Sequence, residues 1–173
     1  MSVLSTIKKR FSPYTYEKTS ISLEEIESAF EAARWAPSGY NSQPWRFVFA
    51  SRDNLNFETL LSFAVEANRE WMQHSGAIVV ILAKTLSDYN GKKDESAEYC
   101  TGLAVGQMLV ELTALGLQAH QIGGFDHKAL SLHLKLPNGV LPMAMMAIGV
   151  TEEEPKDDRQ RESLTTLISN EIS

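Results

Sequence analysis

The residues best suited to binding a flat, polar ligand lie in one short stretch, residues 36–47, with the sequence Ala-Pro-Ser-Gly-Tyr-Asn-Ser-Gln-Pro-Trp-Arg-Phe. Asn41 and Gln43 carry amide side chains, which both donate and accept hydrogen bonds. Pro37 stops a helix, and Gly39 permits a backbone angle that other residues avoid. The same residue types are common in an ordinary turn between a helix and a strand, so composition alone leaves both interpretations open.

Basic residues near the two ends of the chain form a second candidate site. Arg10 and Ser12 follow two lysines, and basic side chains beside a hydroxyl and free backbone N–H groups are suited to binding phosphate. The alternative is the solvated basic end of a helix, where the helix dipole favours Lys and Arg. Arg159 and Arg161 could supply further positive charge to this site. The alternative interpretation is that they belong to an exposed charged tail.

Side chains that could act alone as acid, base, nucleophile or metal ligand are not arranged for such work. The chain has no G-x-G-x-x-G after a strand, no P-loop and no G-x-S-x-G. His127 and His133 are six residues apart, which is not the spacing of a metal pair on a helix, so we expect no metal site. Cys100 lies among apolar residues at helical spacing, which indicates a buried thiol. This pattern suits an enzyme with no catalytic side chain, in which a cofactor carries the chemistry.

The 36–47 stretch resembles the signature of the flavin-dependent nitroreductase family, and the resemblance runs from about Lys9 to Arg161. In that family the loop binds the isoalloxazine ring of FMN across a dimer interface. The resemblance therefore implies an FMN site formed by the matching residues: Arg10, Phe11, Ser12, Tyr14, Pro37, Ser38, Gly39, Asn41, Gln43, Asn68, Ile122, Gly123, Gly124, Arg159 and Arg161.

The resemblance also implies a role for each segment. The Arg10–Ser12 and Arg159–Arg161 segments would hold the phosphate, Asn41 and Asn68 would bond to the edge of the ring, and the backbone at Gly123-Gly124 would approach N5. Two positions depart from the family pattern, because Tyr14 and Trp71 stand where a basic residue is frequent. Either the reduced flavin is stabilised from elsewhere, or its potential differs. Tyr40, Trp71 and His120 are candidates for the substrate pocket.

The implied function is an FMN-dependent NAD(P)H oxidoreductase. It would transfer a hydride through flavin N5, by a ping-pong mechanism, to a small-molecule electron acceptor such as a nitroaromatic, a quinone or a related electrophile. NADH and NADPH both remain possible donors, because no clamp for a 2′-phosphate is visible. The alternative is a non-catalytic flavin-binding or nucleotide-sensing dimer on the same fold, which the aromatic residues at positions 14 and 71 favour. A third interpretation is an interaction domain that binds no flavin.

Several elements must position these residues. Ser22 and Glu25 form a capping box that starts a helix ending at Pro37. Apolar runs predict strands at residues 45–50, 77–83 and 143–150. The first of these is expected to be buried, and the second to be covered on both faces of the sheet. Helices are expected over residues 54–74 and 95–117, and after Asp126. These elements indicate an α+β domain. The resemblance implies a three-layer α-β-α fold with a mostly antiparallel central sheet.

Size and charge narrow the class of protein. A chain of 173 residues fits one domain, residues 1–173, and the net charge of −6 argues against nucleic acid as a partner. We expect no membrane association and a cytoplasmic location, since no apolar run approaches the ~20 residues of a membrane span and the start does not resemble a signal peptide. The 95–117 helix is apolar on all sides, which indicates burial against a second copy. The resemblance likewise implies an intertwined homodimer in which residues 151–173 extend over the partner subunit.

Overall fold

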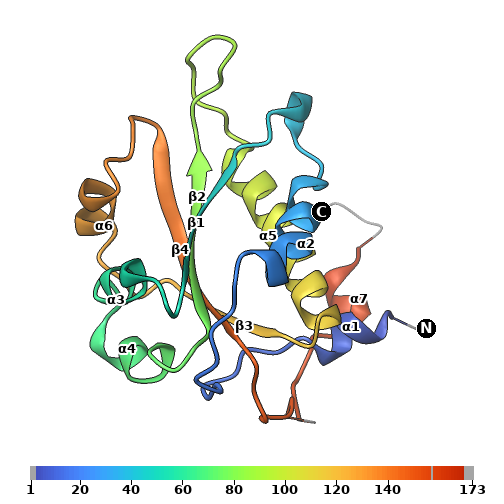
Figure 1. Ribbon diagram of the computed structural model, residues 1–173. Coiled ribbons are helices and arrows are strands. Elements are labelled where there is room, and N and C mark those ends of the chain that lie inside the picture. The colour runs from blue at the N-terminus through green and yellow to red at the C-terminus, as the bar shows by residue number, and fades with distance from the viewer. Residues whose placement is uncertain (1–2, 157, 170–173) are drawn as a thin grey trace.

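A four-stranded sheet forms the centre of the molecule. The computed structural model describes residues 3–156 and 158–169 (Figure 1). The strands are β1 (Trp45–Ser51), β2 (Ala77–Lys84), β3 (Gln118–Ile122) and β4 (Val140–Gly149), and their order in the sheet is β1-β2-β4-β3. Every neighbouring pair is antiparallel.

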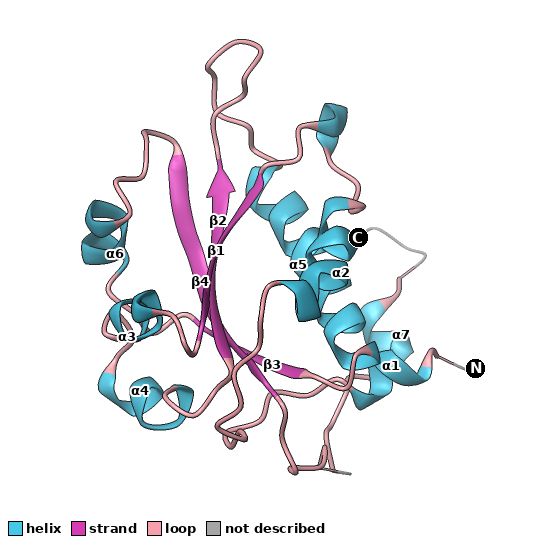
Figure 2. Ribbon diagram, in the orientation of Figure 1, coloured by secondary structure: helices cyan, strands magenta, loops and turns pink. Residues whose placement is uncertain are grey.

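Helices cover both faces of this sheet (Figure 2). One layer contains α1 (Ser5–Lys9), α2 (Glu27–Arg34) and α5 (Ala97–Ala114); the other contains α3 (Leu55–Leu61), α4 (Glu66–Met72) and α6 (His127–His133). Short 3-10 turns η1 (Glu24–Ile26) and η2 (Gly39–Asn41) and a C-terminal turn α7 (Leu164–Leu167) complete the described elements.

Strand β2 joins two separate cores. Its side chains alternate between the faces, so Val79 and Ile81 pack with α2 and α5, whereas Ile78 and Val80 pack with α3 and α4. The predicted central strand is confirmed, because β2 has a partner on each side and all its residues except Lys84 are buried. The predicted three-layer α+β arrangement with an antiparallel sheet is confirmed as well.

Local signals in the sequence also hold. The Ser22 hydroxyl accepts from the Glu25 N–H at 3.2 Å while the Glu25 carboxylate accepts from the Ser22 N–H at 2.7 Å, which is the predicted capping box. Gly116, at φ +80°, ends α5, and the next residue donates its N–H to the carbonyl of Leu112. Asp126 caps α6 through the N–H of Ala129.

The single helix predicted over residues 54–74 is wrong, because the structure has two helices there. The chain between α3 and α4 instead forms a bridge from Ala64 to Phe125, and Val65 donates its N–H to the carbonyl of Gly124 at 3.0 Å. This long-range pairing competes with the helix and places α4 beside the segment that follows β3.

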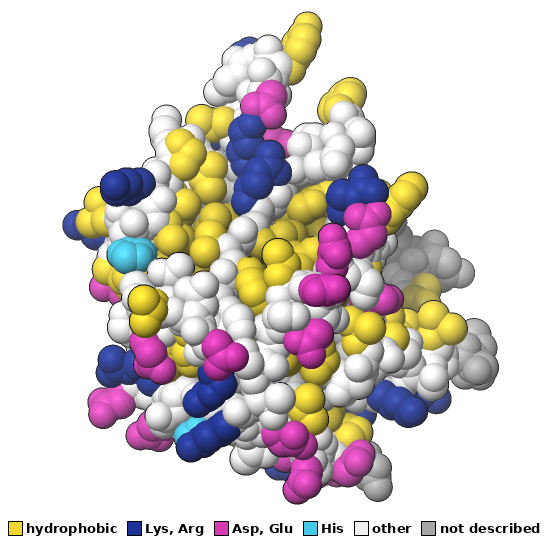
Figure 3. Space-filling model, in the orientation of Figure 1, with side chains coloured by type: hydrophobic (Ala, Val, Ile, Leu, Met, Phe, Trp, Pro, Cys, Tyr) yellow, Lys and Arg dark blue, Asp and Glu magenta, His cyan; other side chains and the backbone are white. Residues whose placement is uncertain are grey.

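The predicted burial of the 45–50 strand is also wrong. Strand β1 lies at an edge of the sheet, and Phe47, Val48 and Phe49 are only partly buried. Hydrophobic atoms are visible at the centre of the molecular surface in the view of Figure 3. Strand β3 has no long apolar run in the sequence and forms by pairing with β4. Within the described part of the chain, no helix combines the length and apolar character that crossing a membrane requires.

Candidate functional site

Arginines from both ends of the chain meet beside α1. Burial, followed by the positive charges of Arg159 and Arg161, lowers the pKa of Arg10 below its ordinary value. A nitrogen of the Arg10 guanidinium lies 3.4 Å from the hydroxyl of Ser12. We call Arg10, Ser12, Arg159 and Arg161 the arginine cluster. None of the ion pairs between described residues involves these arginines, so their charge is available to an anion.

Arg159 has a different part in this cluster from its neighbours. Its two terminal nitrogens donate to the carbonyls of Arg10 and Lys8, both at 2.8 Å, and its Nε donates to the carbonyl of Lys156 at 3.2 Å. These bonds tie the C-terminal segment to the end of α1. Arg10 and Arg161 keep most of their N–H donors for a ligand.

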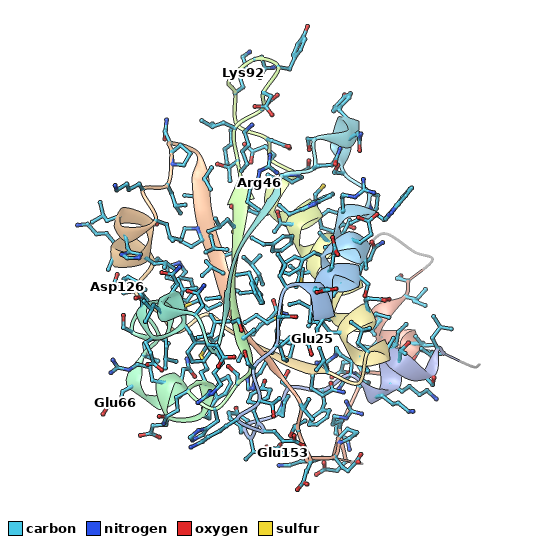
Figure 4. The ribbon with its side chains drawn as sticks, viewed as in Figure 1. Glu25, Arg46, Glu66, Lys92, Asp126 and Glu153 are labelled. Atoms are coloured by element: carbon cyan, nitrogen blue, oxygen red, sulfur yellow. The ribbon has the colours of Figure 1, made fainter. Side chains whose placement is uncertain are left out.

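The loop after α1 is held by a carboxylate near the other end of the chain. Glu153 accepts hydrogen bonds from the Tyr14 N–H at 3.0 Å, the Thr15 N–H at 2.5 Å and the Thr15 hydroxyl at 2.6 Å (Figure 4). Phe11, which is buried, donates its N–H to Gln118 at the start of β3. The loop that carries Ser12 is therefore fixed on both sides.

Asn68 and Gly124 form a close contact at the end of β3. The Gly124 carbonyl accepts from the Asn68 amide at 3.2 Å, and a Cβ at position 124 would lie 2.9 Å from the Asn68 Nδ2. A Cβ at Gly123 would meet nothing within 4 Å. Gly124 thus permits the contact with Asn68, while Gly123 borders open space. Ile122 is buried beneath them, in the core on the α3 and α4 side.

Aromatic rings from the loop after α1, from α4 and from β3 contact one another. His120 stacks on Trp71 with ring centroids 4.4 Å apart, and Tyr14 meets His120 edge-on at 4.8 Å. Trp71 is buried, whereas Tyr14 is exposed. Two of the three predicted substrate-pocket residues, Trp71 and His120, therefore lie together.

The 36–44 loop is strained. Tyr40, Asn41 and Gln43 have φ values of 51°, 57° and 44°, in the left-handed region that residues other than glycine seldom adopt. The prediction that Gly39 supplies the unusual backbone angle is wrong; instead, Gly39 makes room, because a Cβ there would lie 3.1 Å from the hydroxyl of Ser96. The Ser38 hydroxyl stabilises the loop by accepting from the Gln43 N–H at 3.0 Å.

A cavity of about 790 Å³ opens beside this loop. Tyr40, fully exposed, lines it from the loop side, and Tyr89 and Lys92 line it from the segment between β2 and α5. Pro37 lies outside this cavity and lines a groove with Trp35 beside α5.

The loop and the arginine cluster lie at opposite ends of the sheet. Trp45, at the start of β1, pairs with Ala83, whereas His120 pairs with Ala147, which in turn pairs with Ile78. Five residues along β2 correspond to about 17 Å, and β1 and β3 are opposite edges, about 14 Å apart. Figure 4 shows the same separation, with Arg46 near the upper end and Glu153 near the lower end. A single chain therefore does not bring the predicted flavin-binding residues of the 36–44 loop together with those near the arginine cluster.

Comparison with known proteins identifies the family. The chain matches the model of the Nitroreductase family over residues 7–70 and 56–150. It is 30% identical over 155 residues to an Archaeoglobus fulgidus protein named "Putative NADH dehydrogenase/NAD(P)H nitroreductase", with 87% of this chain and 86% of that protein covered. The chain belongs to the nitroreductase family.

Solved structures share the nitroreductase fold of this chain. An oxidoreductase containing FMN is 26% identical, with a TM-score of 0.83 over 88% of this chain and 79% of that one. A Desulfovibrio desulfuricans protein in complex with FMN is also 26% identical, with a TM-score of 0.80 over 100% of this chain and 98% of that one. The arginine cluster of this nitroreductase family member fits a phosphate group, because guanidinium groups that repel one another and have no carboxylate partner among the described residues are stabilised by an anion.

Sequence reasoning missed two positioning residues of this nitroreductase family member, Glu153 and Gln118. Glu153 is the middle residue of three consecutive glutamates, which together are typical of a solvated loop. Its partners lie 138 and 139 residues away in the sequence, so no local pattern marks it. In the described residues no group of His, Cys, Asp and Glu is arranged to hold a metal ion.

Proposed function

We propose that this protein is an FMN-dependent NAD(P)H oxidoreductase that reduces a small electrophile such as a nitroaromatic or a quinone. The observation that carries the proposal is the arginine cluster, which has no carboxylate partner among the described residues and leads through the 10–14 loop to the Asn68–Gly124 contact. The names of a relative and of a similar solved structure, which mention NAD(P)H and FMN respectively, support the same cofactors. FMN would supply hydride transfer through its N5 atom.

The residues of the chain would bind and orient this cofactor. Arg10 and Arg161 would donate to the phosphate, with Ser12 beside them. Asn68, whose amide is oriented by Gly124, would bond to the edge of the ring, and the open space at Gly123 would admit the reacting face. Water exclusion and stacking against neighbouring aromatic side chains would position the acceptor.

We propose in addition that two copies associate and that the 36–44 loop of each serves the flavin of the other. A Cβ added at Gly102 or Gly106 of α5 would meet no other part of the chain within 4 Å, and Trp35 is 72% exposed beside them. Leu103 and Val110 line the same groove, of about 620 Å³. An apolar surface of this kind supports packing against a second copy.

Flavin titration of the purified apoprotein tests the cofactor. We expect FMN to bind in a 1:1 ratio with the chain and give a yellow protein, and we expect anaerobic NADH or NADPH to bleach it within seconds. Failure to take up FMN would refute the proposal. Binding without bleaching by either donor would favour the non-catalytic flavin-binding dimer, which the uncharged contact between Tyr14 and Trp71 also suits.

Mixed dimers test the shared site. One chain carries Arg10→Ala with Arg161→Ala, and the other carries Asn41→Ala in the loop. If the two halves of a site come from different chains, the mixed dimer contains one fully intact site and recovers half of the normal flavin reduction. If both halves come from one chain, every site is damaged and nothing is recovered.

A further inference from the structure

His120 lies between the two anchors of the proposed flavin site. Two residues before it in β3, Gln118 accepts from the Phe11 N–H in the loop of the arginine cluster. Four residues after it, Gly124 contacts Asn68. A ligand that reaches from one anchor to the other passes beside this imidazole.

The hydrogen bonding of His120 defines which nitrogen faces a ligand. Its Nδ1 lies 2.8 Å from the carbonyl oxygen of Pro13, which can only accept, so Nδ1 carries a hydrogen. Nε2 of His120 has no hydrogen-bond partner among the described residues. It is also not a fully buried atom, because the buried side-chain nitrogen without a partner in these residues is Nδ1 of His74. Stacking on Trp71 holds the ring in place. Nε2 is therefore open to a ligand and can take up a second proton.

The groups that face His120 offer little other positive charge. The loop after α1 contributes Tyr14 and Tyr16, and burial raises the pKa of Tyr16 so that its phenol stays neutral. Helix α4 contributes the uncharged Trp71, and β4 contributes Ala147. The charged groups nearby are Glu153, which binds the backbone of Tyr14, and beyond it the arginine cluster.

We propose that His120, protonated at Nε2, supplies the positive charge that stabilises the reduced, negatively charged form of the bound FMN. This inference rests on the proposed function. A cation beside the ring favours the reduced state electrostatically, and histidine is the side chain that gains such a charge near neutral pH. Neither Tyr14 nor Trp71, the other rings of the group, can do so.

The test is the midpoint potential of the bound flavin in the parent protein and in His120→Gln. At pH 6.0 the parent is expected to favour reduced over oxidised FMN about tenfold more than the variant, a difference of ~30 mV for a two-electron couple. At pH 8.5 the difference should become smaller, because a histidine side chain ordinarily loses its charge above neutral pH. His120→Lys keeps a charge at both pH values and should retain the higher potential at pH 8.5.

The matched control is His133→Gln, because His133 is an exposed histidine on α6 that packs on Phe63. Its potential should equal that of the parent at both pH values. Equal potentials for the parent and His120→Gln at pH 6.0 would overturn the inference while leaving the proposed function intact, whereas failure of the parent to bind FMN would refute the proposed function itself.

A second measurement uses the parent alone and remains decisive if His120→Gln does not bind FMN. Coupling between two sites is reciprocal, so reduction of the flavin must favour protonation of His120. At pH 7 the NMR signals of the His120 ring should move toward the imidazolium position when the flavin is reduced anaerobically. Signals that do not move would overturn the inference.

Discussion

The arginine cluster and the 36–44 loop are built in opposite ways. Around the cluster, Arg159 and Glu153 bond to backbone groups, so each supporting contact is made within one chain. The loop instead holds three residues at positive φ and places Tyr40 fully in solvent. Backbone strain persists where the surrounding structure enforces it and is common at ligand-binding sites.

In the proposed dimer, one half of the site is ready for its ligand within a chain, while the other half serves a ligand held by the second copy. The loop is locked locally, because the carbonyl of Gln43 accepts from Arg46 at 2.8 Å and the N–H of Gln43 donates to Ser38. The Tyr40 side chain of this loop is nevertheless fully exposed. A second copy would cover it.

The largest effect is expected from removing the free arginines. Arg10→Ala with Arg161→Ala deletes two charge-assisted contacts worth about 1.5–3 kcal/mol each, so FMN affinity should fall roughly 100- to 10,000-fold. Fluorescence titration of the apoprotein measures it. The charge-matched control is Arg34→Ala with Lys128→Ala, both exposed, which should change affinity less than about twofold. Equal losses in the two proteins would show that only net charge matters.

The two glycines after β3 differ in their surroundings, because Gly124 packs closely against Asn68 and Gly123 faces open space. Gly124→Ala places a methyl group 2.9 Å from Asn68 and 3.2 Å from Val65, so we expect a loss of about 1–3 kcal/mol in the free energy of unfolding. Gly123→Ala enters open space and should change it by less than about 0.5 kcal/mol. Urea unfolding of the apoproteins measures both. If Gly123→Ala were the more destabilising change, the close contact would be misassigned.

A change at Glu153 tests whether the arginine cluster depends on the hydrogen bonds that hold the loop carrying Ser12. Glu153→Gln weakens the hydrogen bonds to Tyr14 and Thr15, so the loop that carries Ser12 loosens and FMN affinity should fall about tenfold. Glu154→Gln removes the same charge from the neighbouring exposed residue and should have an effect below about twofold. Equal effects of the two variants would mean that the acidic segment acts through its charge and not through the clamp.

Local chemistry predicted much of the fold from the sequence. The Ser22–Glu25 capping box, the turn at Gly116 and the cap at Asp126 depend on residues within a few positions of one another, and β2 is apolar enough to require cover on both faces. The break between α3 and α4 depends on Phe125, which is 61 residues from its bridge partner Ala64. No local pattern contains that information.

The candidate site shows the same limit. The arginines and amides were recognisable by type, but the docking of Arg159 on the carbonyls of Lys8 and Arg10 joins opposite ends of the chain. Composition assigned the left-handed backbone angle to Gly39, whereas Tyr40, Asn41 and Gln43 adopt it. The FMN site shared between two chains and the extension of residues 151–173 over a partner stay predictions.

The smallest expected effect concerns the strain at Tyr40, at φ 51° and ψ 23°. Tyr40→Gly removes a left-handed strain of about 1 kcal/mol and also raises the entropy of the unfolded chain, so the free energy of unfolding should change by less than about 1 kcal/mol. Lys135→Gly, at the same φ of 51° but outside the site, should change it similarly. Only Tyr40→Gly should also weaken FMN binding, by about threefold, because an ordered loop loses less entropy on binding than a loosened one. Denaturant unfolding and flavin titration of the two variants give both numbers. If Lys135→Gly weakened FMN binding as much, the strain of the 36–44 loop would have no special connection with the flavin.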